Sequence, residues 1–421
     1  MSDQIVDVAV IGGGPAGSTA AAMLRQLGRT VVQFEKTPHP RFHIGESLLP
    51  FTLGLFKKTG ALPVLQQAGF VPKWGGRFQT ADDKLGHTFY FTDAFFPEFP
   101  GAWQVLRSKF DHLLLEHSRS CGTDVRENHT VKDVEFAADG VTLQVRDAEG
   151  GHYSLRARYL ADATGRDAFL ATKLSLKRPD AALRKVAIFA HFKNARRDEG
   201  RDAGNTISFL IRGGWIWWIP LADDTTSIGV VVDGDVFKRA KMPPEEYFAF
   251  VMSRVPALTE RLTHAHRLAE VHVTSDFSYS TTELTGDRWL LLGDAGFFLD
   301  PIFSSGVHLA VTSGIAAAEA MHQSLDQPLA RPRLFAGYRR LMRYNQRLYR
   351  RFIYGWYEPG FMELLLSPTH RFQLVEAVTS VLAGAPKTWQ LTWRLRIFEF
   401  LVRLNQRVGF VPVFDRAGLP P

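Results

Sequence analysis

The sequence predicts a mixed α/β fold, in which a doubly wound, Rossmann-like domain is interrupted by an antiparallel β-sheet and followed by a helical region. Three observations predict it. An apolar run at residues 5–11 leads through a glycine-rich turn at 12–17 into a helical pattern at 15–27. Runs rich in β-branched and aromatic residues, separated by short turns, fill residues 186–232. Beyond residue 330 the apolar spacing becomes helical.

The first domain is expected to be discontinuous. After the helix, Thr30–Phe34 forms a second strand that ends at Glu35, as in the opening of a doubly wound sheet. Apolar runs at 159–165 and 289–294 have the same character, and we expect them to rejoin that sheet. The expected boundaries are residues 1–80, 101–175 and 280–330 for the first domain, 81–100 and 176–279 for an inserted substrate domain, and 331–421 for a helical region.

Four strand-like runs separated by Gly-Gly or Asp-Asp turns predict the inserted domain. These runs are Val186–Phe192, Thr206–Ile211, Trp215–Leu221 and Ser227–Val232. Such spacing is typical of an antiparallel meander.

Composition excludes several classes of protein. The chain has 421 residues, 45% of them hydrophobic and 22% charged, which is ordinary for a globular protein. Its one cysteine, Cys121, allows no disulfide framework and no cysteine metal site, so we expect no bound metal and a reducing cytoplasmic location. The longest uncharged stretch, Val8–Leu24, is broken by glycines, and the N-terminus lacks a signal-peptide pattern. We expect no membrane span.

The positive charge is concentrated in the C-terminal region. Residues 331–421 hold 14 Arg and 1 Lys against 4 Glu and 1 Asp, a net charge of +10, whereas the whole chain carries +7. Solvated helix faces would account for any single arginine, but this excess also fits an acidic protein partner. We expect no nucleic-acid ligand, and we expect charge reversal at Arg350 and Arg351 to weaken binding of an acidic partner.

The glycine turn indicates a dinucleotide site. Gly12-x-Gly14-x-x-Gly17 follows a strand and opens a helix at Pro15 and Ala16, so that backbone can approach a pyrophosphate at the positive helix end. Glu35 ends the second strand 18 residues after Gly17, where a carboxylate can accept hydrogen bonds from ribose hydroxyls.

Later motifs resemble the FAD monooxygenases of the p-hydroxybenzoate hydroxylase type. Gly293-Asp294 resembles their Gly-Asp pair beside the ribityl chain, and Arg107, in Arg107-Ser108-Lys109-Phe110-Asp111, resembles their cofactor-facing arginine. The resemblance implies an FAD-binding Rossmann-like domain, with cofactor contacts at Arg107, Val131 and Asp294. No second glycine fingerprint for NAD(P)H exists, so we expect a separate flavin reductase to supply reduced FAD.

Three further stretches resemble the flavin-dependent halogenases of the phenol and pyrrole type. Trp215-Ile216-Trp217-Trp218-Ile219-Pro220 matches their W-x-W-x-I-P hexapeptide, although the spacing alone fits a buried strand equally well. Residues 293–310 resemble their loop under the flavin, and residues 41–50 resemble their flavin strap. The resemblance implies cofactor contacts at Arg41, Ile44, Gly45, Glu46, Ser47, Pro301, Gly306 and Val307, a halide held by the amides of Ser305 and Gly306, and a substrate path walled by Trp215, Trp217 and Phe303.

The catalytic residue implied by this resemblance is Lys73, which falls where the family has its single catalytic lysine. A lysine is ordinarily a solvated surface charge. Set between Pro72, Trp74 and two glycines, Lys73 can instead be inward and desolvated, which would lower its pKa. Family chemistry then implies that reduced FAD, O2 and chloride or bromide give hypohalous acid. Lys73 would relay the halogen to an aromatic ring either by hydrogen bonding the hypohalous acid or as a chloramine.

Phe303 narrows the expected substrate. Tryptophan halogenases have a glutamate where Phe303 stands, so the resemblance implies a self-activated ring, a phenol or a pyrrole, tethered to an acidic acyl or peptidyl carrier protein of natural-product biosynthesis. We expect a chlorinase. The alternatives are a halogenase of free phenols, a same-fold FAD monooxygenase or prenyl reductase, and a non-catalytic FAD-binding protein.

Overall fold

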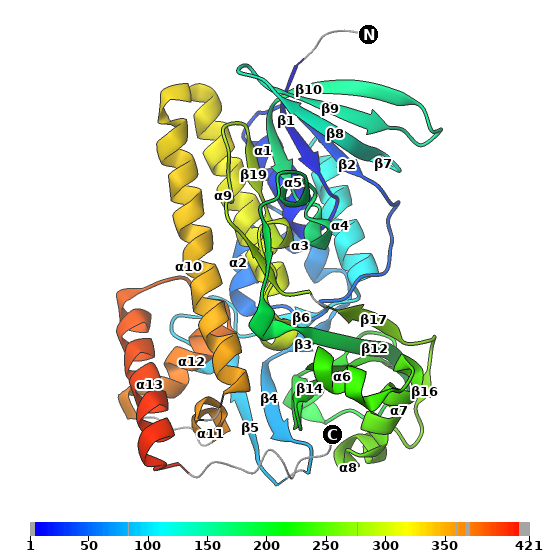
Figure 1. Cartoon of the computed structure of the whole chain (residues 1–421), viewed down its shortest axis with the longest axis vertical. Coiled ribbons are helices and arrows are strands. Elements are labelled where there is room, and N and C mark those ends of the chain that lie inside the picture. Colours follow the sequence, from blue (N-terminus) through cyan, green and yellow to red (C-terminus); the bar gives the residue numbers. More distant parts are fainter. Residues whose placement is uncertain (1–4, 83, 276, 359, 367–370, 412–421) are drawn as a thin grey trace.

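The computed structural model describes residues 5–82, 84–275, 277–358, 360–366 and 371–411. Two β-sheets follow one another along the long axis of the molecule, and helices cover their sides (Figure 1). The long helix α10 runs down one flank past both sheets and ends beside the C-terminal helices. Segments far apart in sequence therefore meet between the sheets, where the candidate site lies.

The first sheet is built around the glycine turn. Its strand order is β7-β2-β1-β10-β9-β8, with β19 pairing with β10. The strands β1, β2, β7, β10 and β19 are parallel, whereas β8, β9 and β10 form an antiparallel flap. Their bounds are β1 Val6–Ile11, β2 Val31–Glu35, β7 Asp124–Glu127, β8 Thr130–Phe136, β9 Val141–Arg146, β10 His152–Asp162 and β19 Trp289–Leu291.

Three helices pack on this sheet and bring its distant parts together. They are α1 (Pro15–Gln26), α4 (Arg107–Ser120) and α9 (Gly306–Asp326). The helices α1 and α9 cross closely because Gly314 lets the backbones approach, since a Cβ at Gly314 would lie 2.7 Å from the Ala16 oxygen. The N-terminal ends of α1 and α9 both border the cavity described below.

The second sheet contains the predicted meander. Its order is β16-β12-β15-β14-β13-β4-β5, with β17 pairing with β12. The four expected runs are its central strands, and their pairs β12–β15, β15–β14 and β14–β13 are antiparallel. The bounds are β4 Gly75–Thr80, β5 Gly86–Tyr90, β12 Lys185–Lys193, β13 Thr206–Ile211, β14 Gly214–Pro220, β15 Thr225–Asp233, β16 His266–Arg267 and β17 His272–Ser275.

One edge of this sheet differs from the prediction. The strand β4 was expected in the first domain, whose first segment ended at residue 80, yet it pairs with β13 in the second sheet. That pairing is parallel, so the sheet is not wholly antiparallel. The physical reason is that β3 (Val71–Lys73) leaves the first domain to pair with β6 (Ala102–Gln104), and the chain enters the second sheet two residues later.

The outer face of the second sheet is covered by α6 (Gly234–Ala240), α7 (Pro244–Ser253) and α8 (Pro256–Arg261). Ile216, Trp218 and Val230 point to this side and share a core with Tyr247 and Val251 of α7. The opposite face, which carries Trp215 and Trp217, is turned toward the first sheet and α10. The alternation of β14 therefore divides its three tryptophans between two environments.

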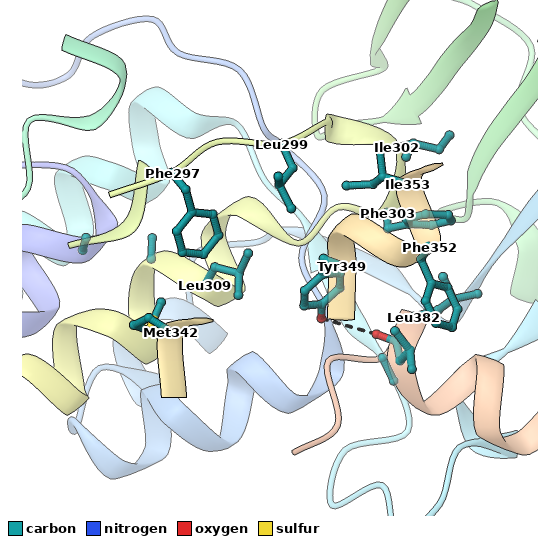
Figure 2. Close-up of a cluster of buried hydrophobic side chains, with 14 of the residues drawn as sticks. Phe297, Leu299, Ile302, Phe303, Leu309, Met342, Tyr349, Phe352, Ile353 and Leu382 are labelled. Carbon is teal, nitrogen blue, oxygen red and sulfur yellow. Dashed lines mark hydrogen bonds between the residues drawn. The ribbon is translucent and has the colours of Figure 1, made fainter. Parts of the chain in front are cut away.

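The C-terminal region is helical and closes one end of the molecule. It contains α10 (Arg331–Tyr357), α11 (Phe361–Leu366), α12 (Leu374–Leu382) and α13 (Trp389–Val408). Figure 2 shows the 297–303 loop packed beside α10, with Phe303 next to Phe352 and with Tyr349 donating a 3.4 Å hydrogen bond to the Val381 carbonyl. These helices are thus part of the core that backs the site.

The remaining elements are short. They are α2 (Pro50–Lys58), α3 (Leu62–Gln66), α5 (Phe169–Lys173), the pair β11 (Lys177–Pro179) and β18 (Tyr279–Thr281), and 3₁₀ turns at Phe91–Asp93, Gly165–Asp167, Ala181–Leu183, Gly200–Asp202, Gly293–Ala295, Pro301–Phe303, Pro328–Ala330 and Arg371–Gln373. Among the described helices, none combines the length and the apolar character needed to cross a bilayer.

Candidate active site

A cavity of about 930 Å³ lies between the two sheets. The glycine turn, the strap, the 292–310 loop and β14 border it. Nineteen of the residues expected from sequence line it, namely Gly12, Gly14, Pro15, Ala16, Glu35, Arg41, Ile44, Gly45, Glu46, Ser47, Arg107, Val131, Trp215, Trp217, Asp294, Pro301, Ser305, Gly306 and Val307. Three expected residues, Gly17, Lys73 and Phe303, lie outside its lining.

The glycine turn is shaped by close backbone packing. Gly12 has a φ of +113°, and a Cβ there would lie 2.2 Å from the Ala163 oxygen. A Cβ at Gly17 would lie 2.0 Å from the Gly12 oxygen, so Gly17 serves the contact between helix and turn and does not face the cavity. Gly14, by contrast, has only one atom near its Cβ position, Nη2 of Arg41 at 4.0 Å.

The start of α1 fits the pyrophosphate of FAD. Gly14 is its N-cap, with no side chain capping the helix and no acidic residue in the first turn. The free N–H groups and the positive dipole end therefore face the cavity. The Glu35 carboxylate stands beside them, accepting hydrogen bonds from the Gly13 amide (2.7 Å) and the Thr37 amide (3.0 Å). Donors for a phosphate and an acceptor for a ribose hydroxyl are thus placed as a dinucleotide requires.

The strap is held in place by Arg107. Its guanidinium makes two bonds to the Asp111 carboxylate (2.7 and 2.8 Å) and donates to the carbonyls of Ile44 (2.5 Å) and Gly45 (3.3 Å). Gly45 has a φ of +93°, which only glycine adopts readily. Arg107 lines the cavity, but these hydrogen bonds show that it also fixes the strap that forms one wall.

The opposite wall ends at the start of α9. Ser304 is left-handed (φ +54°) and turns the chain, Ser305 caps the helix without a side-chain bond, and the first turn has no acidic residue. A Cβ at Gly306 would meet no atom within 4 Å, so this amide borders open space. A helix of 21 residues thus directs its positive end into the cavity, an arrangement suited to an anion.

Lys73 is buried next to the cavity wall. Its ammonium donates to Ser47 Oγ (2.8 Å) and to the Leu48 carbonyl (3.2 Å), and it lies 5.1 Å from the centre of the Phe91 ring. Ser47 lines the cavity, so one hydroxyl separates the amine from it. Burial lowers the pKa of Lys73 to about 7, because the charged form loses its hydration without gaining an anion.

The W-x-W-x-I-P strand β14 presents two rings to the cavity and one to the core. Trp215 and Trp217 line the cavity with ring centres 6.0 Å apart, whereas Trp218 packs on the far side of the sheet. The Trp217 indole lies over Gly229 on β15, where a Cβ would come within 2.1 Å of the ring. The glycine opposite Trp217 therefore leaves room for that ring.

Phe303 lies behind the wall. It is buried in an aromatic cluster, with ring centres 6.4 Å from Phe78, 6.0 Å from Phe352 and 5.9 Å from Trp356. Its neighbours in sequence, Ile302 and Ser304, do line the cavity. The 3₁₀ turn at Pro301–Phe303 explains this, because it sends successive side chains to different sides.

Sequence reasoning missed a hydrogen-bonded chain at the inner end of the cavity. The Tyr357 hydroxyl accepts from Trp215 Nε1 (3.0 Å) and donates to Asp300 Oδ2 (2.8 Å). Burial raises the pKa of Asp300 to about 6. Lys185 Nζ lies 3.5 Å from the centre of the Tyr357 ring. Asp300 precedes Pro301 in the 293–310 loop, so its sequence position could have marked it as a site residue. No local sequence pattern connects Asp300 with Tyr357, which is 57 residues away.

A second missed residue is His191 of β12. Its Nε2 lies 2.7 Å from Glu46 Oε1, so it holds the buried strap carboxylate. His43 instead contacts the neighbouring Ile44 carbonyl through Nδ1 (2.6 Å). The partner of Glu46 comes from the second sheet and has no motif to mark it.

Comparison with known proteins first defines the class. Residues 5–340 match the family model described as FAD binding domain, so the chain is a member of that class of flavoproteins.

The comparisons then define the family. The chain is 30% identical over 400 residues to a 1H-pyrrole-2-carbonyl-[peptidyl-carrier protein] chlorinase of Pseudomonas fluorescens, covering 89% of each protein. It is 34% identical over 324 residues to the corresponding brominase of Pseudoalteromonas luteoviolacea, covering 76% of this chain and 78% of the other. A solved flavin-dependent brominase superposes with a TM-score of 0.86 at 29% identity, covering 96% of this chain and all of the other. The chain belongs to the flavin-dependent halogenases.

A further solved structure is similar in fold. A flavoprotein/dehydrogenase from Cytophaga hutchinsonii has a TM-score of 0.88 at 29% identity, and the match covers 96% of this chain and 100% of that one. The predicted mixed α/β architecture of an FAD-dependent enzyme is therefore confirmed.

Proposed function

We propose that this halogenase is a chlorinase that acts on a pyrrolyl or phenolic group tethered to an acyl or peptidyl carrier protein, with Lys73 as the catalytic residue. The observation that carries the proposal is the place of Lys73, which is buried beside the cavity wall and has a pKa lowered to about 7. Its hydrogen-bond partners among the described residues include no carboxylate. Such an amine exists in both protonation states near neutrality.

Reduced FAD bound in the cavity would pass two electrons to O2, and the resulting peroxide-level oxidant would oxidise chloride or bromide to hypohalous acid, leaving oxidised FAD and water. The residues of this chain would place the reactants. The α1 end and Glu35 would bind the nucleotide half, the strap held by Arg107 and His191 would cover the flavin ring, and the amides of Ser305 and Gly306 would hold the halide. We propose that a flavin reductase supplies the reduced flavin, and that the enzyme works in the reducing cytoplasm.

Lys73 would then take up the halogen. Its neutral amine displaces water from hypohalous acid, forming an N–halogen bond with loss of the amine proton to the departing hydroxide. The ring carbon next attacks this halogen, the N–halogen bond breaks, and the proton leaving the ring carbon restores the amine. Ser47 accepts a hydrogen bond from Lys73 and would orient the amine toward the cavity.

An electron-rich substrate fits the surroundings of Phe303. Position 303 itself carries a ring packed in an aromatic cluster instead of a carboxylate, so the proposal assigns stabilisation of the cationic ring to the substrate's own nitrogen or oxygen. Two relatives are named for a pyrrole carried on a peptidyl carrier protein, and the net charge of +10 in residues 331–421 suits an acidic carrier.

One assay tests the proposal. The assay contains the enzyme, a flavin reductase, NADH, FAD, O2 and either chloride or bromide. Carrier-bound pyrrole, carrier-bound tyrosine and free phenols are tested as substrates in parallel. The products are identified by mass spectrometry. Chlorination of a carrier-bound ring is expected. Chlorination confined to free phenols would move the assignment to a free-substrate halogenase, and hydroxylation alone would make it a monooxygenase.

A further inference from the structure

Helix α13 has an apolar face that is covered and an opposite face that residues 5–411, as far as they are described, leave exposed. Leu391, Leu395 and Phe398 are buried against α10, α11 and α12. The opposite side of the helix is exposed and carries a stripe that we call the outer α13 face, made of Trp389, Arg396, Phe400, Arg403, Leu404 and Arg407. Trp389 is 74% exposed and Phe400 is 62% exposed. Large aromatic side chains with this degree of solvent exposure, gathered on one face, are typical of an interaction surface.

Within the described part of the chain, the charges of this face also lack partners. Arg396, Arg403 and Arg407 make no ion pair or hydrogen bond with any residue that the structure describes. The acidic residue beside them, Glu399, is already paired with Arg351 of α10 at 2.5 Å. Arg347 lies one turn before Arg351 on the same side of α10 and adds to the positive field. The face therefore combines uncompensated positive charge with exposed aromatic rings.

The arrangement favours a protein partner over a lipid surface. A helix that lies in a membrane interface separates its apolar face from its basic face. On α13 the arginines alternate with Trp389, Phe400 and Leu404 within one stripe. Exposed tryptophan and arginine in one patch are the residues that dominate binding energy in protein interfaces.

The face lies close behind the active site. Phe398, on the inner side of the same helix, stacks on Phe352 of α10 with ring centres 6.4 Å apart. Phe352 contacts Phe303 at 6.0 Å, and Trp356, one turn further along α10, lies 6.4 Å from the cavity residue Trp215. Helix α10, which lies beside α13 in Figure 1, and its aromatic cluster thus stand between the outer α13 face and the cavity wall.

We propose that the outer α13 face docks the acidic carrier protein that brings the substrate. This inference rests on the proposed carrier-dependent function. The docking site proposed here differs from the one expected from sequence, which was to be tested at Arg350 and Arg351. Arg350 pairs with Asp180 and the Tyr354 hydroxyl, and Arg351 pairs with Glu399. Reversing the charge of either arginine would therefore disturb contacts within the enzyme.

The test measures binding and turnover separately. The probe is a peptidyl carrier protein loaded with 1H-pyrrole-2-carbonyl on its phosphopantetheine, and the comparison substrate is the pantetheine thioester of the same acid. Binding of the loaded carrier is followed by fluorescence anisotropy. We expect Arg396→Glu with Arg403→Glu to weaken binding about ten-fold or more and to flatten its salt dependence. Trp389→Ala with Phe400→Ala should weaken it similarly and keep the salt dependence. Halogenation of the pantetheine thioester should not change.

A matched control applies the same charge change elsewhere. Lys238 and Arg239 are exposed on α6, on the far side of the second sheet, and Lys238→Glu with Arg239→Glu should leave carrier binding at the wild-type level. Unchanged carrier binding by the α13 variants would overturn the docking proposal and leave the halogenase assignment standing. Equal loss of activity with both substrates would also overturn it. If the α13 variants lost binding to anionic phosphatidylglycerol vesicles but kept carrier binding, the face would be assigned to a membrane. If the wild-type enzyme bound no carrier, both the docking and the carrier-dependent function would be refuted.

Discussion

At the scale of single residues, the distinguishing feature is an amine without a counter-charge. Lys73 lies in a buried position where its two oxygen partners, Ser47 Oγ and the Leu48 carbonyl, are neutral. Neutral acceptors replace only part of the lost hydration, so burial lowers the pKa of Lys73 to about 7. The local setting between Pro72, Trp74 and two glycines allowed an inward, desolvated lysine but did not require one. The family resemblance is what singled out Lys73 among the lysines.

The lowered pKa predicts how halogenation depends on pH. Below about pH 7 Lys73 is protonated and cannot form a bond to halogen, whereas above it the neutral amine predominates. We therefore expect the halogenated product formed per O2 consumed to rise as the pH increases through about 7. The measurement is the ratio of halogenated product formed to O2 consumed at pH values about 5.5 to 8.5, a range that brackets the pKa of one titrating group. A ratio that falls with pH would identify the ammonium form as the active one.

The Asp300–Tyr357–Trp215 chain gives a second residue-scale prediction. Tyr357→Phe removes the acceptor of the Trp215 indole N–H and a donor to the buried Asp300 carboxylate. Removing one partner of a buried hydrogen bond costs about 1–3 kcal/mol, so we expect a loss of this order in the free energy of unfolding measured with urea. The pKa of Asp300 should also rise, because the Tyr357 hydrogen bond opposes the effect of burial on it. Tyr354→Phe, which also removes a hydroxyl from α10 but at a residue outside the cavity lining and bonded to Asp180, serves as the control. Equal stability of wild type and Tyr357→Phe would contradict the proposed coupling.

At the scale of elements, the proposed halide site lies at the start of α9. Gly306→Ala places a methyl group where no protein atom lies within 4 Å, so the fold should accept it. Replacing glycine by alanine within a helix stabilises a protein by about 0.5–1 kcal/mol, whereas the methyl group would stand in the way of a halide at this amide. We expect unchanged or raised stability together with a raised KM for chloride.

A control for this prediction lies on α10. Gly337 also has no atom near its Cβ position, and Gly337→Ala should raise stability without any change in the KM for chloride. The measurements are thermal unfolding and halogenation at varied chloride. If Gly306→Ala and Gly337→Ala had the same KM for chloride, the α9 amide would not be the halide site.

At the scale of the whole molecule, the sequence predicts what is local and misses what is brought together by tertiary packing. The strand, turn and helix around Gly12 follow from short-range pattern, and so do the central strands of the second sheet. The transfer of β4 to the second sheet does not, because its residues read as a strand in either sheet and only the pairing with β13 decides.

The same limit applies to the site. The glycine turn, the strap and the 292–310 loop were found from sequence because each is a contiguous stretch that borders the cavity. The motifs missed His191 and Tyr357, whose partners lie 145 and 57 residues away. They also placed Phe303 in the substrate wall, whereas the 3₁₀ turn directs it into the aromatic cluster behind that wall. Such positions depend on side-chain direction, which motif spacing does not encode.

The central claim, that Lys73 transfers the halogen, is tested most directly by Lys73→Met, because methionine fills the buried space without an amine. The assay measures halogenated product, O2 consumption and hypohalous acid released to a small-molecule trap. We expect FAD binding and O2 consumption at wild-type levels, release of free hypohalous acid, and product reduced about 100-fold or more. Lys109→Met, which removes an exposed lysine bonded to the Ala68 carbonyl, should behave as wild type. Product formation by Lys73→Met at the wild-type rate would contradict the assignment.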